Sequence, residues 1–297
     1  MKAVLLLAHG SPDTAAEADI REFLSNVTGG RVLPDATVEE IRRRYERIGR
    51  SPLTEITMRQ AQALERELGI RVYVGMRNWR PYIADAIQQM SADGVTQAIA
   101  ICLAPQNSRT SVGLYKQALE ASGAPPFAVD FVKSWHDNPA LISAFAEKLK
   151  AAWKKACDES GVQVPTIFTA HSVPTRTIAD GDPYENQARE TARAVALACE
   201  LPDSVWCCAF QSQGAAGGPW IGPTVEETLL ALKNQGATAA LIQPIGFVCD
   251  HVEILYDIDI AFKKFAEENG MKLWRTESLN DSPAFIEALA GLVRRRA

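Results

Sequence analysis

Short apolar runs alternate with amphipathic stretches along the whole chain, and this alternation constrains the fold more than any other feature. Eight runs have the length of a strand, and they span residues 3–8, 71–75, 97–103, 128–132, 166–170, 204–210, 237–244 and 271–275. Helical patterns separate them, as at 53–68, 81–90, 139–155, 183–198 and 223–233. Strands that alternate with helices predict α/β architecture, with parallel sheets covered by helices on both faces.

The eight expected strands divide into two sets of four that begin alike. The first strand of one set runs into His9-Gly10-Ser11-Pro12, and the first strand of the other runs into His171-Ser172-Val173-Pro174. A chain of 297 residues is long enough for two cores. We therefore expect duplicated halves, with one domain over residues 1–135 and a second over residues 136–297.

Two of the four histidines directly follow an expected strand. Ligands of parallel α/β sheets bind outside the carboxyl ends of the strands, so His9 and His171 are expected to border one cleft if the halves face each other. His136 follows a tryptophan in the expected linker and is interpreted as structural. His251 is either a ligand or a partner at the start of a helix.

Acidic residues gather around His251. Asp250, Glu253 and Asp257 are spaced three and four residues apart, which places them on one face if the segment is helical. The pattern fits an exposed acidic face, and it also fits a path that leads a divalent cation or protons into the cleft.

A glycine-rich loop and a basic run offer two further candidates. The loop at 213–223 lacks the spacing of nucleotide-binding loops, and its Trp220 between prolines is either a wall for a flat ligand or part of an ordinary loop. The run at 41–47 contains Arg44 and is either a solvated helix face or a clamp for carboxylates.

Composition excludes several classes of protein. A net charge of −5 argues against wholesale nucleic-acid binding, and the longest apolar runs fall short of the roughly 20 residues that a membrane span needs. None of the six cysteines forms a C-x-x-C pair, which favours free thiols in a reducing compartment. The apolar N-terminus is brief and continues into His9, so we interpret it as a strand rather than a signal peptide and expect a cytoplasmic protein.

Five motifs in this order and spacing resemble the ferrochelatase family over nearly the whole chain. They are Ser51-Pro52-Leu53-Thr54-Glu55-Ile56-Thr57, Thr169-Ala170-His171-Ser172-Val173-Pro174, Gly181-Asp182-Pro183-Tyr184, Pro219-Trp220-Ile221-Gly222-Pro223 and Gly246-Phe247-Val248-Cys249-Asp250-His251-Val252-Glu253-Ile254-Leu255-Tyr256-Asp257. The resemblance implies two similar Rossmann-like domains, each a four-stranded parallel sheet flanked by helices, with a porphyrin cleft between them. It also implies that the last helix packs back on the body.

The same resemblance implies roles for individual residues. His171 and Glu253 match the pair that binds iron and removes the pyrrole protons, so they are the expected catalytic residues and metal ligands. The expected substrate-binding residues are His9, Arg31, Arg44, Tyr45, Ser51, Tyr115 and Trp220. Two of them mark departures from the coproporphyrin-using branch, because His9 replaces an iron-contacting tyrosine and Arg31 is the nearest substitute for an arginine that is Thr28 here. Ala261 replaces an acid of the relatives.

The expected activity is that of a lyase-class chelatase of heme biosynthesis. Fe²⁺ would be inserted into coproporphyrin III to give coproheme, with protoporphyrin IX as an open substrate. The alternatives are a cobalt or nickel chelatase acting on sirohydrochlorin-type rings and a non-catalytic heme carrier. We expect no resident cofactor and no iron–sulfur cluster, a monomer without stable membrane insertion, and either an iron donor or a heme acceptor as partner.

Overall fold

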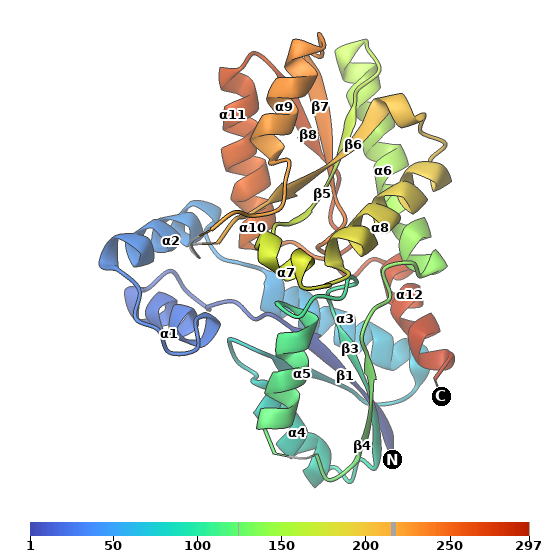
Figure 1. Ribbon diagram of the computed structural model, residues 1–297. Helices are drawn as coiled ribbons and strands as arrows, with labels where there is room; N and C mark the ends of the chain where they lie inside the picture. Colours follow the sequence, from blue (N-terminus) through green and yellow to red (C-terminus); the bar gives the residue numbers. More distant parts are fainter. Residues whose placement is uncertain (124, 215–217, 297) are drawn as a thin grey trace.

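Two four-stranded parallel sheets form the two halves of the molecule, one above the other in Figure 1. The computed structural model describes residues 1–123, 125–214 and 218–296. The strand order is β2-β1-β3-β4 in the first sheet and β6-β5-β7-β8 in the second, so both sheets have the same topology. The predicted α/β fold with duplicated four-stranded sheets is confirmed.

All eight strands lie within two residues of the predicted runs. Their bounds are β1 (Lys2–Ala8), β2 (Val72–Met76), β3 (Gln97–Cys102), β4 (Ala128–Val132), β5 (Thr166–His171), β6 (Trp206–Gln211), β7 (Ala239–Pro244) and β8 (Lys272–Arg275). β1 and β5 are central strands with apolar residues on both faces, as in Val4 to Leu7, which are fully buried.

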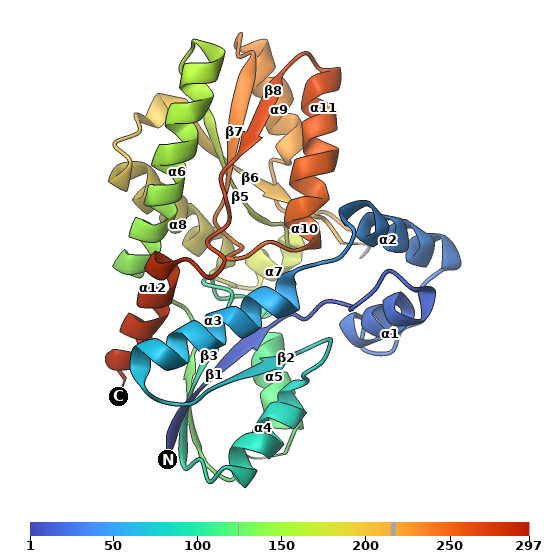
Figure 2. The ribbon, with the colours of Figure 1, turned by 180° about the vertical axis from the view of Figure 1, so that it is seen from behind.

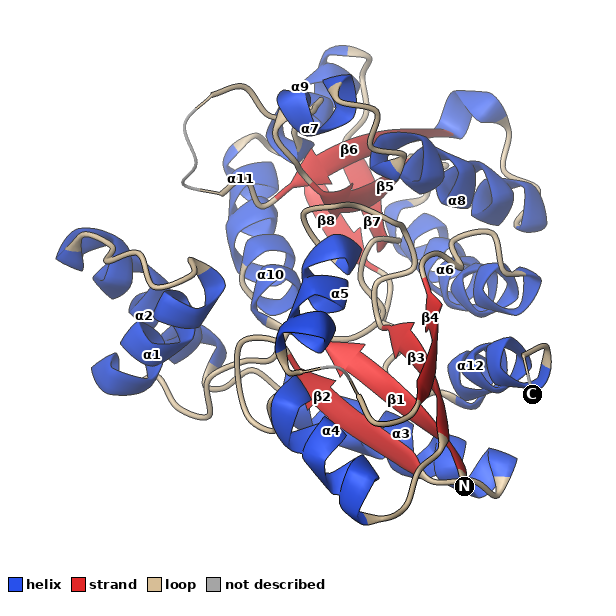
Figure 3. Cartoon of the chain, turned by 60° about the horizontal axis from the view of Figure 1, so that its bottom comes forward, coloured by secondary structure: helices blue, strands red, loops and turns tan. Residues whose placement is uncertain are grey.

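Helices cover both faces of each sheet (Figures 1 and 3). In the first half they are α1 (Glu17–Val27), α2 (Asp35–Ile48), α3 (Leu53–Leu68), α4 (Ile83–Ala92) and α5 (Val112–Ala121). In the second they are α6 (Pro139–Ser160), α7 (Thr175–Ala179), α8 (Tyr184–Ala198), the 3₁₀ turn η1 (Asp203–Val205), α9 (Val225–Asn234), α10 (Val252–Leu255), the π-helical turn η2 (Asp257–Phe262), α11 (Lys263–Glu268) and α12 (Pro283–Arg294). In the described residues, no helix has both the length and the apolar character needed to cross a bilayer.

The carboxyl ends of the two sheets face each other. Gln106, which follows β3, donates a hydrogen bond of 3.1 Å to the carbonyl oxygen of Ile245, which follows β7. The chain passes from one half to the other between Val132 and Pro139, and the predicted boundary at residue 135 lies in this connection. α12 then packs against both α6 and α3, so the C-terminal helix contacts elements of both halves (Figure 2).

The α1–α2 pair projects to one side of the first sheet (Figure 1). Its helices pack on each other through a small cluster of buried side chains that includes Phe23, Tyr45 and Trp79. Val252 of α10 packs against this cluster. The pair therefore reaches the second half at the segment that carries Glu253.

Candidate active site

His171 and Glu253 approach each other where the second sheet ends. His171 is the last residue of β5, Glu253 lies in α10, and the Nε2 atom of the histidine is 3.5 Å from the Oε1 atom of the glutamate. Each side chain keeps about a third of its surface exposed, 33% for His171 and 32% for Glu253. Two donor atoms at this separation suit a single first-row ion, since ligands about 2.1 Å from one ion lie about 3.0–3.4 Å apart.

The charges of this pair support each other. Burial opposes the charge of Glu253, but His171 and His251 outweigh it and hold the pKa of Glu253 well below its usual value. Burial also opposes protonation of His171, yet Glu253 overcomes this effect and raises its pKa. His251 adds a second imidazole, with its Nε2 atom 3.4 Å from Oε2 of Glu253. The carboxylate is therefore held ionised between two histidines.

Backbone carbonyls fix the orientation of both strand-end imidazoles. The Nδ1 atom of His171 contacts the carbonyl oxygen of Ser172, and Nδ1 of His9 lies 3.1 Å from the carbonyl oxygen of Gly10. A carbonyl accepts only, so each neutral ring carries its hydrogen on Nδ1 and keeps the Nε2 lone pair for a metal or a proton. Tyr184 donates a hydrogen bond of 2.9 Å to the His171 carbonyl and holds the strand end in place.

His9 occupies the position in the first half that His171 occupies in the second. Its ring is solvent-exposed although protein surrounds it, and this partial loss of solvent together with the cation of Arg77 lowers its pKa, while Glu253 opposes the shift. The turn after it requires Gly10, whose φ is +84° and where a Cβ would lie 2.8 Å from the backbone nitrogen of Trp79.

The charge of Glu253 acts on side chains from both halves. Burial raises the pKa of Tyr45, Tyr115 and Tyr184, and Glu253 raises each further. Tyr45 and Tyr115 belong to the first half and Tyr184 to the second. The charge of Glu253 thus acts on the His9 ring from the opposite half of the molecule.

Asp257 begins the π-helical turn that follows α10. The Ala261 amide donates to the carbonyl of Tyr256, five residues back, at 2.9 Å. Ser212 donates a hydrogen bond of 2.5 Å to Oδ2 of Asp257, and Nη1 of Arg44 lies 3.6 Å from Oδ1. Because Asp257 is buried, its pKa is raised to about 6, so this carboxyl group exchanges protons near neutral pH.

The predicted acidic face is wrong for Asp250. This residue precedes α10, and its carboxylate accepts hydrogen bonds from Ser278 at 2.7 Å and Asn280 at 3.0 Å. Arg275 lies 3.3 Å from it. The chain is still extended at position 251, so Asp250 turns toward β8 and away from Glu253.

The predicted substrate-binding residues differ in accessibility. Tyr45 is 2% exposed and accepts a hydrogen bond from Ser11 at 3.3 Å, while Ser51 and Tyr115 are also buried. A ligand can touch these three only if neighbouring side chains move. Arg31 is exposed in the loop between α1 and α2. Trp220 is half-buried and its ring packs on Gly214, although residues 215–217 of the predicted loop lie outside the described residues.

Arg44 is a predicted substrate contact whose side chain is 36% exposed. Its guanidinium lies 5.3 Å from the centre of the Tyr256 ring, and Nη2 donates to Glu40 at 2.5 Å. In the described part of the chain, its buried Nε has no hydrogen-bond partner. A carboxylate ligand would meet the exposed part of the Arg44 side chain and not this buried nitrogen.

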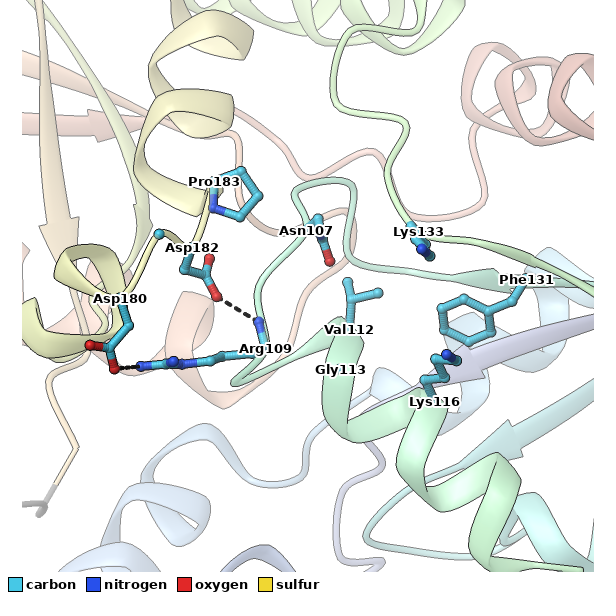
Figure 4. Close-up of a pocket in the computed structure, with 11 residues that line it drawn as sticks. Asn107, Arg109, Val112, Gly113, Lys116, Phe131, Lys133, Asp180, Asp182 and Pro183 are labelled. Atoms are coloured by element: carbon cyan, nitrogen blue, oxygen red, sulfur yellow. Dashed lines mark hydrogen bonds and ion pairs between the residues drawn. The ribbon is translucent and has the colours of Figure 1, made fainter.

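Sequence reasoning missed Arg77, although a signal was present. Arg77 directly follows β2, which pairs with β1. Its position relative to His9 therefore follows from the strand-end rule, by which residues just after neighbouring parallel strands meet at the same edge of the sheet. A cavity of about 400 Å³ lies elsewhere in the molecule (Figure 4). Its walls include Arg109, which pairs with Asp180 at 2.6 Å, and Lys133. His171 and Glu253 do not line it.

The site offers an ion two donor atoms, one from His171 and one from Glu253. In residues 1–123, 125–214 and 218–296, no group of three or more histidine, cysteine, aspartate or glutamate side chains is arranged to hold a metal. When the His171 imidazole is neutral, it can bind a divalent ion beside the ionised carboxylate of Glu253, and the carboxyl group of Asp257, with its raised pKa, can accept protons.

Comparisons with known proteins agree on one family. The family model described as Ferrochelatase matches residues 1–297. A protein named ferrochelatase from Acidobacterium capsulatum is 52% identical, covering 98% of this chain and 93% of its own. A coproporphyrin III ferrochelatase from Geobacillus sp. is 35% identical, covering 99% of this chain and 97% of its own. The structure of SirB from Bacillus subtilis with Fe³⁺ has a TM-score of 0.59 and 13% identity, covering 100% of this chain and 95% of that one, and shows the shared fold alone.

Proposed function

The chain belongs to the ferrochelatase family of lyase-class chelatases, and on that premise we propose that it inserts Fe²⁺ into coproporphyrin III to form coproheme. The observation that supports this most is the 3.5 Å approach of His171 Nε2 to Glu253 Oε1 in an accessible position between the two sheets. Porphyrin is the substrate and heme the product.

Metallation requires removal of two pyrrole protons and delivery of a divalent ion that has lost its water. We assign both tasks to the pair. The neutral His171 imidazole binds Fe²⁺, and the ionised Glu253 carboxylate holds the ion or takes up a proton. Asp257, with a pKa near 6, receives protons from Glu253. His9 offers a second Nε2 lone pair from the opposite half, so we propose that it contacts the iron or the ring.

The preference for coproporphyrin III rests on Arg44 and on the relatives that carry this substrate in their name. Coproporphyrin bears more propionates than protoporphyrin, and the arginine side chain of Arg44, which is 36% exposed, favours a carboxylate-rich ring. Arg31, exposed in the neighbouring loop, is proposed to bind another propionate. Tyr45, Ser51, Tyr115 and Trp220 remain proposed contacts.

The test is steady-state metallation under anaerobic conditions. Fe²⁺ is offered with coproporphyrin III and with protoporphyrin IX, and Co²⁺ and Ni²⁺ are offered with sirohydrochlorin. We expect kcat/KM to be highest for Fe²⁺ with coproporphyrin III and to vanish in His171→Ala. Faster turnover of sirohydrochlorin would make the protein a cobalt or nickel chelatase. Tight heme binding without any insertion would make it a carrier.

We further propose that the enzyme works as a cytoplasmic monomer without a resident cofactor or iron–sulfur cluster. An iron donor or a heme acceptor would be its protein partner. Metal analysis of the purified protein tests the absence of a resident cofactor, and its mass in solution tests the monomeric state. Stoichiometric iron with sulfide, or a stable dimer, would contradict them.

A further inference from the structure

We propose that Arg275 is a positioning residue that sets the orientation of Glu253 and Asp257 by holding both ends of the segment between residues 250 and 259. Arg275 is the last residue of β8. Its Nε and Nη2 atoms donate to the two oxygens of Asp259 at 2.7 and 2.8 Å. Its Nη1 atom lies 3.3 Å from Oδ1 of Asp250. This inference rests on the proposed metallation.

One guanidinium thus binds two carboxylates nine residues apart in sequence, and the proposed reactive groups lie between them. The fork of an arginine can bind one carboxylate with two parallel bonds and still turn a third donor to another group, whereas a lysine ammonium cannot reproduce that geometry. Arg275 also donates to the carbonyl of Thr276 at 2.9 Å, which fixes the fork on the strand end.

The two ends of the segment are not held equally. Asp250 has additional hydrogen bonds from Ser278 and Asn280, and its amide donates to Asn280 at 2.9 Å. In the part of the chain that the structure describes, the carboxylate of Asp259 is bound by Arg275 alone. If Arg275 were lost, the end of the segment at Asp259 would therefore be released, while the end at Asp250 would still be held by Ser278 and Asn280.

Asp259 lies in the π-helical turn η2, which begins with Asp257. A π turn holds one more residue than an α turn, is rare in proteins, and occurs frequently at functional sites. If the released segment relaxed to an α-helix, the register would shift by one residue, which is about 100° of rotation. Asp257 would then leave Ser212, and Glu253 would turn relative to His171.

The experiment compares Asp259→Asn, which keeps the size of the side chain, with Asp259→Glu, which keeps its charge. Glu277→Gln is the matched control, because Glu277 is two residues from Arg275, highly exposed, and paired with Lys148 instead. We measure kcat and its pH profile with coproporphyrin III and Fe²⁺, the porphyrin Kd by fluorescence quenching, and Tm.

For Asp259→Asn we expect kcat to fall about tenfold or more and its pH profile to shift, with the porphyrin Kd within about twofold of the wild type. Asp259→Glu should recover part of kcat, and Glu277→Gln should behave as the wild type. The inference is overturned if folded Asp259→Asn keeps the wild-type kcat and pH profile, or if only its Tm falls. Absence of turnover in the wild type would instead overturn the proposed function, and this inference with it.

Discussion

Asp257→Asn should make the protein more stable above pH 6. Burial raises the pKa of this carboxyl group from 3.8 to about 6, while the hydrogen bond from Ser212 opposes the shift. Between these values, the unfolded chain has released the proton and the folded chain still holds it, so folding stability falls as the pH rises and stays lower above pH 6. A difference of about two pH units, at about 1.4 kcal/mol each, is worth about 3 kcal/mol.

Asparagine removes this dependence because it is neutral at every pH and can still accept the hydrogen bond from Ser212. The variant should therefore be about 3 kcal/mol more stable than the wild type at pH 8, and the gain should shrink to about 0.5 kcal/mol at pH 4. A constant offset from altered packing would not change with pH. The pH-dependent part of the difference is thus the quantity that reports on the buried charge.

Urea unfolding at a series of pH values between 4 and 8 measures this pH-dependent difference in stability. Asp13→Asn is the control, because Asp13 is exposed. For Asp257→Asn, the urea concentration at the unfolding midpoint should rise above that of the wild type as the pH approaches 8. For Asp13→Asn, the plot of midpoint against pH should coincide with that of the wild type. The reasoning is refuted if Asp257→Asn shows the same stability difference at both ends of the series, or if it is less stable than the wild type at pH 8.

Three substitutions test the remaining groups. His171→Ala should lower the metallation rate by about 10³-fold or more and leave the porphyrin Kd within a few-fold, as measured by fluorescence quenching; near-normal turnover would remove His171 from the mechanism. Glu253→Gln should slow insertion about 10²-fold, and an unchanged kcat would move proton acceptance elsewhere. His9→Ala should change the affinity for Fe²⁺ or heme more than Tm; a large fall in Tm with unchanged kinetics would identify His9 as structural.

The sheets were predictable because their central strands, β1, β3, β5 and β7, are buried on both faces and carry continuous apolar runs. The residues at which the strands begin and end were less predictable. Apolar residues also occupy the turns that precede strands, as in η1, where the chain from 203 to 205 forms a 3₁₀ turn before β6 begins at Trp206. Likewise β7 begins at Ala239, after the turn through Gly236 and its φ of +92°. Periodicity alone does not separate these turns from the strands they enter.

The strand-end rule was sufficient for His9 and His171, since it needs only the position of each histidine after an apolar run. Arg77 needed the strand order as well. The burial of Tyr45 depends on how α1 packs on α2, which no local pattern specifies. The proposed substrate contacts were therefore predictable as positions, and their accessibility was not.

The segment after β7 shows why spacing misled the analysis of the carboxylates. Helical spacing assumes 3.6 residues per turn from Asp250 to Asp257, but the helix begins only at Val252 and widens into a π turn at Asp257. Each departure lies two residues from a carboxylate that Arg275 binds, Asp250 or Asp259, and Arg275 lies more than fifteen residues farther along the chain. A contact at that separation overrides the local period, turns Asp250 toward β8 and leaves Glu253 facing His171. The geometry of the proposed metallation site is thus set by the end of β8 as much as by the residues that would bind the iron.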